Sequence, residues 1–441
     1  MPRRVTRRTF VQTTTAVGAA LFIPRSVWGA NERLNVACVG VTGRGGEDMD
    51  GVSRENVVAI CDCDERNIAL AAKKAEVAKA KQFYDFRKML DTMGDQIDAV
   101  VVGVPDHNHA PVALAAMRLG KHVYCEKPLA HNVHEIRLMR ETAKQKKLAT
   151  QMGTQIHAGD NYRRVVELVK AGAIGTVKRA HNWVPTSYSG SQKNVKQPEG
   201  TPPVPEGLHW DLWLGPAAER PYHPDYHPFW WRGWWDFANG ALGDMACHHM
   251  DLPHWALNLR EPLTIESEGP EPDLVVCPPW QIVHYHYPAR GDQPPVHLTW
   301  YHGGKRPPEL EEIESKQEKK RPWGAGTLFV GEKGMLLADY DNHVLLPEEQ
   351  FKGFKRPEKS IPKSAGHHNE WIRACKTGSP TTCNFDYSGA LAETVLLGCV
   401  AYRAGTKIEW DEKAMRVTNS TAANKFLRRE YRKGWEIEGI A

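Results

Sequence analysis

The sequence predicts an α/β fold, in which a parallel sheet is wound on both faces by helices and is followed by a second domain of different composition. Three observations carry this prediction. A short strand runs into a glycine turn and a helix at residues 34–46, strand-like and helix-like segments then alternate up to residue 125, and the chain beyond residue 152 is rich in tryptophan and loops. The length of 441 residues is enough for two or three domains of ordinary size.

The first strand, Leu34–Val39, is followed by glycines that suit a nucleotide-binding turn. Gly40 and Gly45 match the G-x-G-x-x-G pattern, whereas Thr42 stands at the position of its middle glycine, with Gly43 next to it. Strand, glycine turn and helix place a pyrophosphate on the amides of the helix N-terminus. Because the match is imperfect, the turn alone is a weak indication of a dinucleotide site.

A second strand strengthens this interpretation. Val57–Cys61 ends in Asp62, twenty-two positions after Gly40. A carboxylate at this strand end accepts hydrogen bonds from the hydroxyls of the adenosine ribose and repels a 2′-phosphate. The sequence therefore predicts NAD rather than NADP, unless Arg44 or Arg66 is placed to bind that phosphate.

The alternation of strands and helices continues to residue 125. Helices are expected at residues 67–80, 86–93 and 110–119, and strands at 83–84, 98–104 and 120–125. The last two strands end in Pro105 and in Glu126-Lys127-Pro128. Because ligands of open α/β sheets bind outside the carboxyl ends of the strands, we expect Gly40, Asp62, Pro105 and Lys127 to meet at one site.

The second half of the chain combines helices, alternating strands and a long loop. Residues 187–207 are rich in Ser, Gly, Pro, Lys and Gln and are predicted to be a loop at the rim of a site. Seven tryptophans follow between residues 210 and 255; aromatic faces pack against sugars, but most of these rings are expected in the core or at a subunit interface. We also expect strands at 282–287 and 297–301 and a hairpin at 327–336. Helices are expected at 161–171 and 391–401, and a third helix is expected to begin at residue 367. Residues 305–321 are charged and are expected to form an exposed excursion.

The candidate acid–base chemistry of this half lies between Gly240 and Asp251. If the segment is helical, Asp244 and His248 lie one turn apart on one face, and the carboxylate can orient the imidazole as a general base. From the residues alone, a hydrogen-bonded core histidine is the preferred interpretation. A metal site is disfavoured because the spacing does not match H-E-x-x-H and no cysteine pair supports zinc; its ligands would be Asp244, His248, His249, Asp251 and His254.

The first thirty residues are predicted to be an export signal. Arg7 and Arg8 precede a weakly apolar run, and small residues such as Gly29 suit a processing site; an amphipathic or disordered N-terminus is the alternative.

The rest of the composition excludes several classes of protein. Five of the 57 basic residues lie in this leader, which leaves 52 basic against 53 acidic residues in the remainder, so the charge does not indicate a nucleic-acid partner. No apolar run reaches the ~18 residues of a membrane-spanning helix. The nine scattered cysteines form no C-x-x-C pair and predict neither a zinc site nor a disulfide framework.

Together these segments resemble the Gfo/Idh/MocA oxidoreductases. The resemblance rests on the glycine turn, Asp62, Pro105-Asp106-His107-Asn108-His109, Cys125-Glu126-Lys127-Pro128-Leu129, Gly153-Thr154-Gln155, and the pair Asp244 and His248. After the twin-arginine signal at residues 1–30, it implies a Rossmann domain at 31–152 and a C-terminal α+β domain at 153–441. The second domain is expected to hold a large, mostly antiparallel open sheet that packs against a partner subunit, in a homodimer or homotetramer.

The resemblance also implies the roles of the site residues. Catalysis is expected from Lys127, His248 and Asp244, with Lys127 contacting both the nicotinamide region and the substrate and preceding a cis proline bond. The substrate side is expected to include His209, Arg232, Trp235 and His249, and no metal. The residues expected to bind NAD are Gly40, Thr42, Gly43, Arg44, Gly45, Asp62, Pro105, Asn108, His109, Glu126, Lys127 and Gln155.

We therefore expect an exported oxidoreductase, periplasmic or extracytoplasmic, that uses NAD to take hydride from a hydroxyl of a sugar, polyol or glycoside. Because free NAD is scarce outside the cytoplasm, the cofactor is expected to be loaded before export and to stay tightly bound. Tight retention favours an alternative, a redox-neutral glycosidase or lyase that oxidises the sugar transiently, as some exported relatives in this family do. A non-catalytic carbohydrate-binding protein is a third hypothesis, which the joint presence of Lys127, Asp244 and His248 disfavours.

Overall fold

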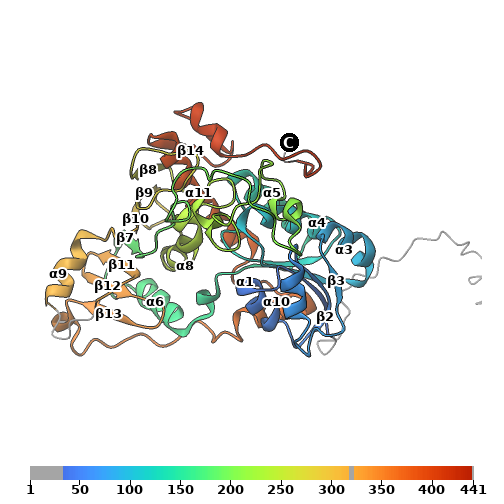
Figure 1. Ribbon diagram of the computed structural model, residues 1–441. Coiled ribbons are helices and arrows are strands. Elements are labelled where there is room, and N and C mark those ends of the chain that lie inside the picture. The colour runs from blue at the N-terminus through green and yellow to red at the C-terminus, as the bar shows by residue number, and fades with distance from the viewer. Residues whose placement is uncertain (1–32, 317–321, 440–441) are drawn as a thin grey trace, which may run out of the picture.

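Two sheets organise the protein, one in each half of the chain (Figure 1). The computed structural model describes residues 33–316 and 322–439, and the predicted leader at residues 1–30 lies outside them. The N-terminal sheet runs from blue to teal in Figure 1, and the strands of the larger second sheet run mostly from yellow to orange.

The N-terminal sheet is the predicted doubly wound parallel sheet. Its six strands are all parallel in the order β3-β2-β1-β4-β5-β6, the arrangement of a dinucleotide-binding fold. The strands are β1 (Asn35–Val39), β2 (Asn56–Cys61), β3 (Lys81–Phe83), β4 (Ala99–Val102), β5 (His122–Cys125) and β6 (Thr150–Met152). The helices between them are α1 (Gly43–Gly51), α2 (Glu65–Ala71), α3 (Phe86–Met93), α4 (His109–Arg118) and α5 (Val133–Lys146).

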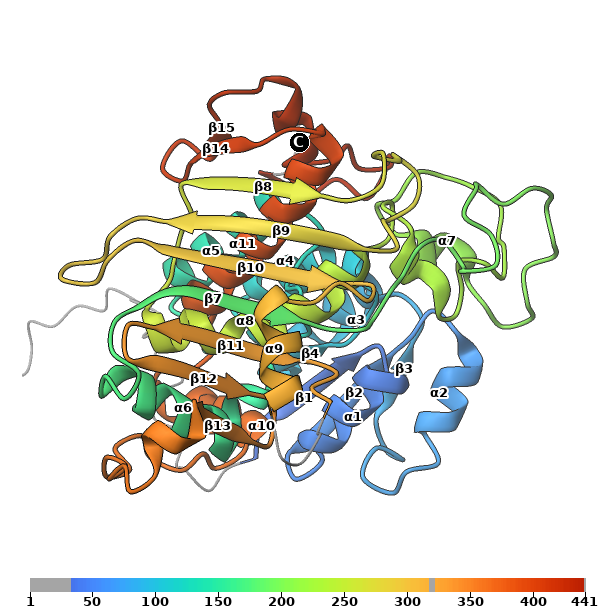
Figure 2. The same cartoon turned by 90° about the vertical axis from the view of Figure 1, so that its left-hand side faces the viewer.

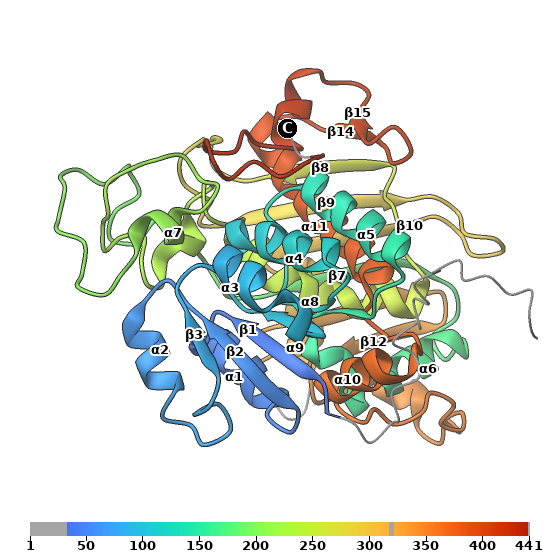
Figure 3. The same ribbon diagram turned by 90° about the vertical axis from the view of Figure 1, so that its right-hand side faces the viewer.

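Both faces of this sheet are covered, which explains why the strands β1, β2 and β4 are almost continuously apolar. Alternate residues of β1 face opposite sides: Val36 packs with residues of α1 and α2, and Ala37 with residues of α3, α4 and α5. The α3–α4–α5 side faces the viewer in Figure 3. Trp371 of α10 (His367–Thr377), near the other end of the chain, packs on the α1 side and is fully buried.

Three glycines allow β1, β4 and α1 to approach closely. Gly40 has a φ of +80°, and a Cβ atom there would lie 2.4 Å from the carbonyl oxygen of Gly103. A Cβ on Gly45 would lie 2.4 Å from the carbonyl oxygen of Gly40. The first and last glycines of the turn are therefore required by packing, before any ligand is considered.

The second half forms a nine-stranded open sheet, in agreement with the predicted mostly antiparallel architecture. The order is β13-β12-β11-β7-β10-β9-β8-β14-β15, and only the β7–β10 pair is parallel. The strands are β7 (Val177–Trp183), β8 (Thr264–Glu268), β9 (Gln281–Tyr287), β10 (Val296–His302), β11 (Gly326–Gly331), β12 (Gly334–Ala338), β13 (His343–Leu346), β14 (Ile408–Asp411) and β15 (Arg416–Val417).

Helices cover the inner face of this sheet and join it to the first domain. The core between them combines inward side chains such as Tyr285 and Leu298 with residues of α8 and α11, and it is continuous with the α4–α5 side of the first sheet. The helices of this half, besides α10, are α6 (Asp160–Lys170), α7 (Trp210–Leu214), α8 (Gly240–Leu257), α9 (Pro308–Lys316) and α11 (Phe385–Ala404).

Two segments differ from the sequence predictions. The charged excursion expected at 305–321 contains α9, which lies across the outer face of the sheet (Figure 2) and buries Leu310 and Ile313 against Trp183 and Tyr301; residues 317–321 lie outside the described part. The helix expected at 67–80 ends at Ala71 and continues as turns. For α9 the local composition was misleading, because two apolar side chains decided the structure.

All nine cysteines are free, and seven are buried. In the described residues, no helix is long and apolar enough to cross a membrane.

Candidate active site

A cleft of about 690 Å³ opens at the carboxyl ends of β1, β2, β4 and β5. It brings together the strand-end residues Gly40, Asp62, Pro105 and Lys127, as the sheet topology predicts. The second half of the chain contributes Asp244 from α8, and the cleft therefore lies between the two domains.

Most of the residues expected at the site line this cleft. Gly45 and Gln155 do not: Gly45 packs behind Gly40, and Gln155 donates hydrogen bonds to Tyr124 Oη (2.8 Å) and Glu126 Oε1 (2.6 Å). The predicted cofactor residues that do line it are Gly40, Thr42, Gly43, Arg44, Asp62, Pro105, Asn108, His109, Glu126 and Lys127.

The nucleotide half of the cleft fits a dinucleotide. Thr42, at the N-cap of α1, makes no side-chain capping hydrogen bond, and the first turn of α1 holds no acidic residue, so the N-terminal amides of this helix are left for a pyrophosphate. Thr42 is extended (φ −132°), which explains why glycine is not required at this position. A Cβ on Gly43 would have no neighbour within 4 Å, so the turn is open where a phosphate would pass.

Lys127 and Asp244 form the central pair of the cleft. Lys127 Nζ donates to Asp244 Oδ1 (2.6 Å) and to the Asp244 carbonyl oxygen (2.7 Å), and both side chains are largely buried, with 13% and 15% exposure. Burial alone would raise the pKa of Asp244, but Lys127 and Arg232 lower it to about 2. Burial would lower the pKa of Lys127, but Asp244 and Glu126 raise it, so the pair is ionised.

The expected hydrogen-bonded pair of Asp244 and His248 is wrong. Both residues lie on α8 as predicted, but the Asp244 carboxylate is bound by Lys127, and His248 Nδ1 is buried without a hydrogen-bond partner. Of the two, only Asp244 lines the cleft. A full charge on Lys127 competes better for the carboxylate than a neutral imidazole does. Burial, and then the charge of Lys127, keep the pKa of His248 well below its usual value, so the ring is neutral.

Asp106 is a cleft residue that the sequence reasoning did not select. It follows Pro105 in the short helix Asp106–Asn108, it is 4% exposed, and its carboxyl group lines the cleft with Lys127 and Asp244. Burial raises the pKa of Asp106 to about 7, against the attraction of Lys127. Its position at a strand end was the available signal, since Pro105 beside it was selected for that reason.

The four residues expected on the substrate side are divided. Arg232 lines the cleft; its guanidinium lies over the Trp231 ring (4.2 Å), and its Nε is 3.7 Å from Asp244 Oδ1. Trp235, His249 and His209 are not part of the cleft wall.

Each of these three side chains has other partners. Trp235 is buried and donates to the Asp273 carbonyl, and His249 is buried and bonded to Tyr340 Oη (2.9 Å). His209 lies at the surface, where it pairs with Glu65 (3.0 Å) and stacks on Tyr84. Placing them at the substrate was wrong, because burial in the core and pairing outside the cleft hold them elsewhere.

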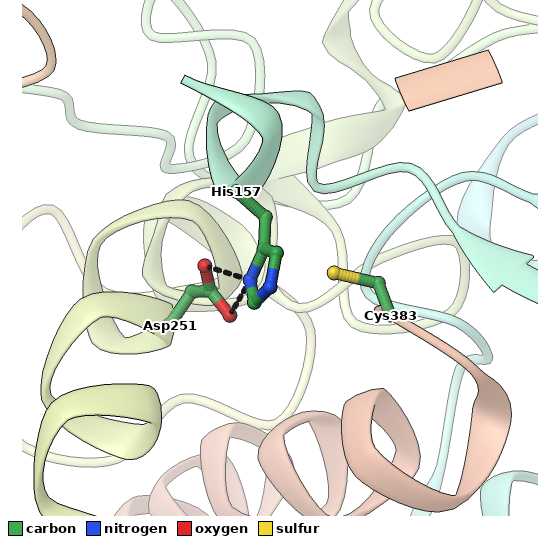
Figure 4. A group of neighbouring side chains, drawn as sticks. All are labelled: His157, Asp251 and Cys383. Carbon is green, nitrogen blue, oxygen red and sulfur yellow. Dashed lines mark hydrogen bonds and ion pairs between the residues drawn. The ribbon is translucent and has the colours of Figure 1, made fainter. Parts of the chain in front are cut away.

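A second cluster of titratable groups lies outside the cleft. His157, Asp251 and Cys383 are all buried, with potential ligand atoms within 4.8 Å of one another (Figure 4). His157 Nδ1 donates to Asp251 Oδ2 (2.8 Å), and the Tyr387 hydroxyl donates to Asp251 Oδ1 (2.7 Å). Burial would lower the pKa of His157, but Asp251 and Cys383 raise it to about 10. The cluster is therefore a buried ion pair in which the imidazole of His157 is protonated on both nitrogens and positively charged.

Comparison with known proteins accounts for both halves of this architecture. Residues 34–154 match the family model of the oxidoreductase family with an NAD-binding Rossmann fold, and residues 163–293 match the model of the C-terminal alpha/beta domain of the same family. Together the two matches cover more than half of the 441 residues. The chain belongs to the Gfo/Idh/MocA oxidoreductase family. The cis Lys127–Pro128 bond agrees with what the resemblance implies.

Named members of the Gfo/Idh/MocA family are similar over part of their length. Inositol 2-dehydrogenase of Rubrobacter xylanophilus is 32% identical over 161 residues, which is 35% of this chain and 45% of that protein. Inositol 2-dehydrogenase of Salmonella typhimurium is 27% identical over 208 residues, 47% of this chain and 48% of that protein. The matched segment thus spans less than half the length of these relatives.

Solved structures show the same fold over a greater length. Levoglucosan dehydrogenase in complex with NADH has a TM-score of 0.57 at 17% identity, covering 86% of this chain and 99% of that one. The WlbA dehydrogenase of Bordetella pertussis, in complex with NADH and UDP-GlcNAcA, has a TM-score of 0.59 at 16% identity, covering 86% and 99%. At these identities the comparison supports the fold alone.

Proposed function

We propose that this protein is an NAD-dependent oxidoreductase that oxidises a hydroxyl of a sugar, polyol or glycoside. The observation that carries the proposal is the Lys127–Asp244 pair at the floor of an interdomain cleft. An ammonium group has three N–H donors, and Asp244 accepts two of them. One donor remains for an oxygen atom of the substrate. The polyol and sugar substrates named for the relatives are consistent with such an oxygen.

Lys127, Asp244 and Arg232, which line the cleft, and His248, one helical turn from Asp244 on α8, have distinct proposed roles. Lys127 binds the reacting oxygen and stabilises the negative charge that develops on it, and Asp244 positions Lys127. His248, which is neutral, accepts the hydroxyl proton. Arg232, already paired with Asp244, borders the substrate space beside Trp231. NAD, when bound along the α1 turn and Asp62, supplies the hydride acceptor.

NAD is proposed in preference to NADP. The two arginines that could bind a 2′-phosphate are engaged: Arg66 pairs with Asp64 (2.6 Å), and Arg44 pairs with Glu47 (2.6 Å) and Asp48 (3.1 Å). Asp62 accepts hydrogen bonds from the amides of Val41 (3.2 Å) and Asp64 (3.0 Å), which holds its carboxylate beside the glycine turn. A negative group fixed there repels a 2′-phosphate.

A redox-neutral glycosidase or lyase is the second candidate, and Asp106 favours it. In that reaction the sugar is oxidised transiently, loses its leaving group by elimination next to the ketone, takes up water and is reduced again. Elimination needs a further acid–base group besides His248, and a buried cleft carboxyl with a pKa of about 7 can both take and give a proton.

The proposal also includes export by the twin-arginine route, with the cofactor tightly retained, and formation of a homo-oligomer.

Three measurements on the purified full chain test these functions. Native mass spectrometry is expected to show bound NAD. NADH formation is then followed with polyols and sugars, and phenol release is followed with aryl glycosides without added NAD. Phenol release without NADH accumulation would replace the dehydrogenase proposal by the redox-neutral one.

Lys127→Ala is expected to abolish either activity. Lys178→Ala, which changes an exposed lysine, is the control. If neither Lys127→Ala nor His248→Ala changes a measured rate, these residues are not its source, and the binding-protein hypothesis is favoured for the cleft.

A further inference from the structure

A second cavity, of about 330 Å³, lies apart from the active-site cleft. It is bounded by the start of α5, by α11 and by residues 426–430, on the side of the second sheet that the helices cover. It therefore does not depend on the outer sheet face, which is expected to pack against a partner subunit. Its lining carries three arginines against two acidic residues, namely Arg403, Arg428 and Arg429 against Asp236 and Glu430. The cavity is cationic.

Arg403 is the central charged group of this cavity. Its Cζ atom lies 4.4 Å from the ring centroid of Phe426 and 5.1 Å from that of Trp235, which holds the guanidinium in place. Among the described residues, its buried Nε has no hydrogen-bond partner. The carboxylate whose charge acts on Arg403, that of Asp236, is bound by Arg220 instead. Because a buried N–H group without an acceptor costs free energy, an acceptor from outside the chain is expected.

Two side chains at the start of α5 are also incompletely bonded. Asn132 Oδ1 accepts the amide of Glu135 and caps α5, but the buried Nδ2 has no partner within the described chain. His131 Nε2 donates to the Trp235 carbonyl oxygen (2.7 Å), and the buried Nδ1 likewise lacks a partner in residues 33–316 and 322–439. Burial keeps the pKa of His131 well below its usual value, so the ring is neutral and Nδ1 carries a lone pair.

A purely structural role for Arg403, as a cation stacked on aromatic rings, is the competing interpretation. It explains where the guanidinium lies, but it leaves Arg403 Nε, Asn132 Nδ2 and His131 Nδ1 unbonded around one cavity. Asn132 and His131 are only 6% and 7% exposed, so bulk solvent does not satisfy them. Three unbonded polar groups around one space point to a single occupant, because buried polar groups are otherwise almost always paired.

We propose that this cavity binds a small oxyanion that also carries a hydroxyl group, such as hydrogen phosphate or a hydroxycarboxylate. The N–H groups of Arg403 and Asn132 donate to the charged oxygens, and the ligand hydroxyl donates to His131 Nδ1. The positive end of the α5 dipole adds to the attraction. Ligand pockets start at about 300 Å³ and a water molecule takes up about 30 Å³, so the cavity has room for such a ligand and a few waters. The proposal is independent of the activity proposed for the cleft.

Calorimetric titration of the full-length protein with sodium phosphate, and separately with sodium gluconate, tests the proposal. NaCl keeps the ionic strength constant, and saturating NAD occupies the α1 turn, where a phosphate would also suit the helix amides. One saturable site per chain is expected. Binding of phosphate alone would identify a phosphate site, binding of gluconate alone a hydroxycarboxylate site, and binding of both a site for the shared oxyanion.

Two variants change the proposed donors. Asn132→Asp keeps the cap of α5, because Asp caps a helix as well as Asn does, but it replaces the N–H donor by a negative charge. Arg403→Gln removes the guanidinium. Each is expected to weaken anion binding by about 10–100-fold, since each removes one charge-assisted hydrogen bond.

Two controls locate the site. Arg416→Gln removes an exposed arginine on β15 and is expected to leave anion binding unchanged. Lys127→Ala changes the cleft and is also expected to leave it unchanged. The proposal is overturned if neither anion binds, if binding survives both Asn132→Asp and Arg403→Gln, or if Lys127→Ala abolishes it. Circular dichroism of every variant checks that the fold is intact.

Discussion

Asp244→Asn removes the charge that holds Lys127 and keeps the size of the side chain. The pKa of Asp244 falls from 3.8 to about 2 in the folded protein. Since one pKa unit corresponds to about 1.4 kcal/mol, the ionised pair contributes about 2 kcal/mol to the free energy of unfolding. Breaking a buried pair costs about 3–5 kcal/mol when the remaining charge has no partner. Lys127 keeps its bond to the Asp244 carbonyl oxygen, so the lower figure is expected.

The pH dependence of this loss follows from the direction of the shift. A carboxyl group whose folded pKa is lowered stabilises the protein fully above its unfolded pKa of 3.8, and the contribution disappears as the pH falls through about 2. The difference between the native protein and Asp244→Asn should therefore be about 2 kcal/mol at pH 7 and about 1 kcal/mol at pH 3. Urea unfolding at the two pH values measures it.

An exposed pair of the same length is the control. Lys74 Nζ and Asp50 Oδ1 are also 2.6 Å apart, but the two side chains are 40% and 57% exposed. Asp50→Asn is expected to change the free energy of unfolding by less than about 1 kcal/mol, because solvent screens the pair. Equal losses in the two variants, or a loss in Asp244→Asn that does not shrink toward pH 3, would refute the reasoning from burial.

Three further predictions concern other residues. His157→Gln is expected to cost about 3–5 kcal/mol below pH 6.5; because the folded pKa of His157 is raised to about 10, urea unfolding should show the cost diminishing as the pH rises through 10. Asp106→Asn is expected to remove an ionisation near pH 7 from the pH profile of kcat/KM and to slow glycoside cleavage by about 100-fold; an unchanged profile would exclude Asp106 as an acid–base group. Asp62→Ala is expected to raise the KM for NAD by about 10–100-fold and to spare that for NADP; equal effects on both would contradict the assignment of the ribose site.

The sequence was most informative about the first domain. The strand β4 (Ala99–Val102) is continuously apolar because both faces of a parallel sheet are buried. The glycine turn and Asp62 lie beside strand ends because of their positions in the chain, independently of the second domain. Local pattern was less informative in the second half. The 305–321 segment is charged on average, yet Leu310 and Ile313 make α9 a cover for the outer sheet face.

Sequence alone thus determined the Rossmann half, the strand-end location of the cleft and the choice of Lys127, because these depend on periodicity and on turn residues close together in the chain. Tertiary structure decided the electrostatic partners. Asp244 is four positions from His248 on α8 but binds Lys127, 117 positions away, because domain packing brings the ammonium group to the carboxylate. It also buried His249 and Trp235 away from the cleft and brought Asp106 into it, since burial and charge pairing depend on what the whole fold places nearby.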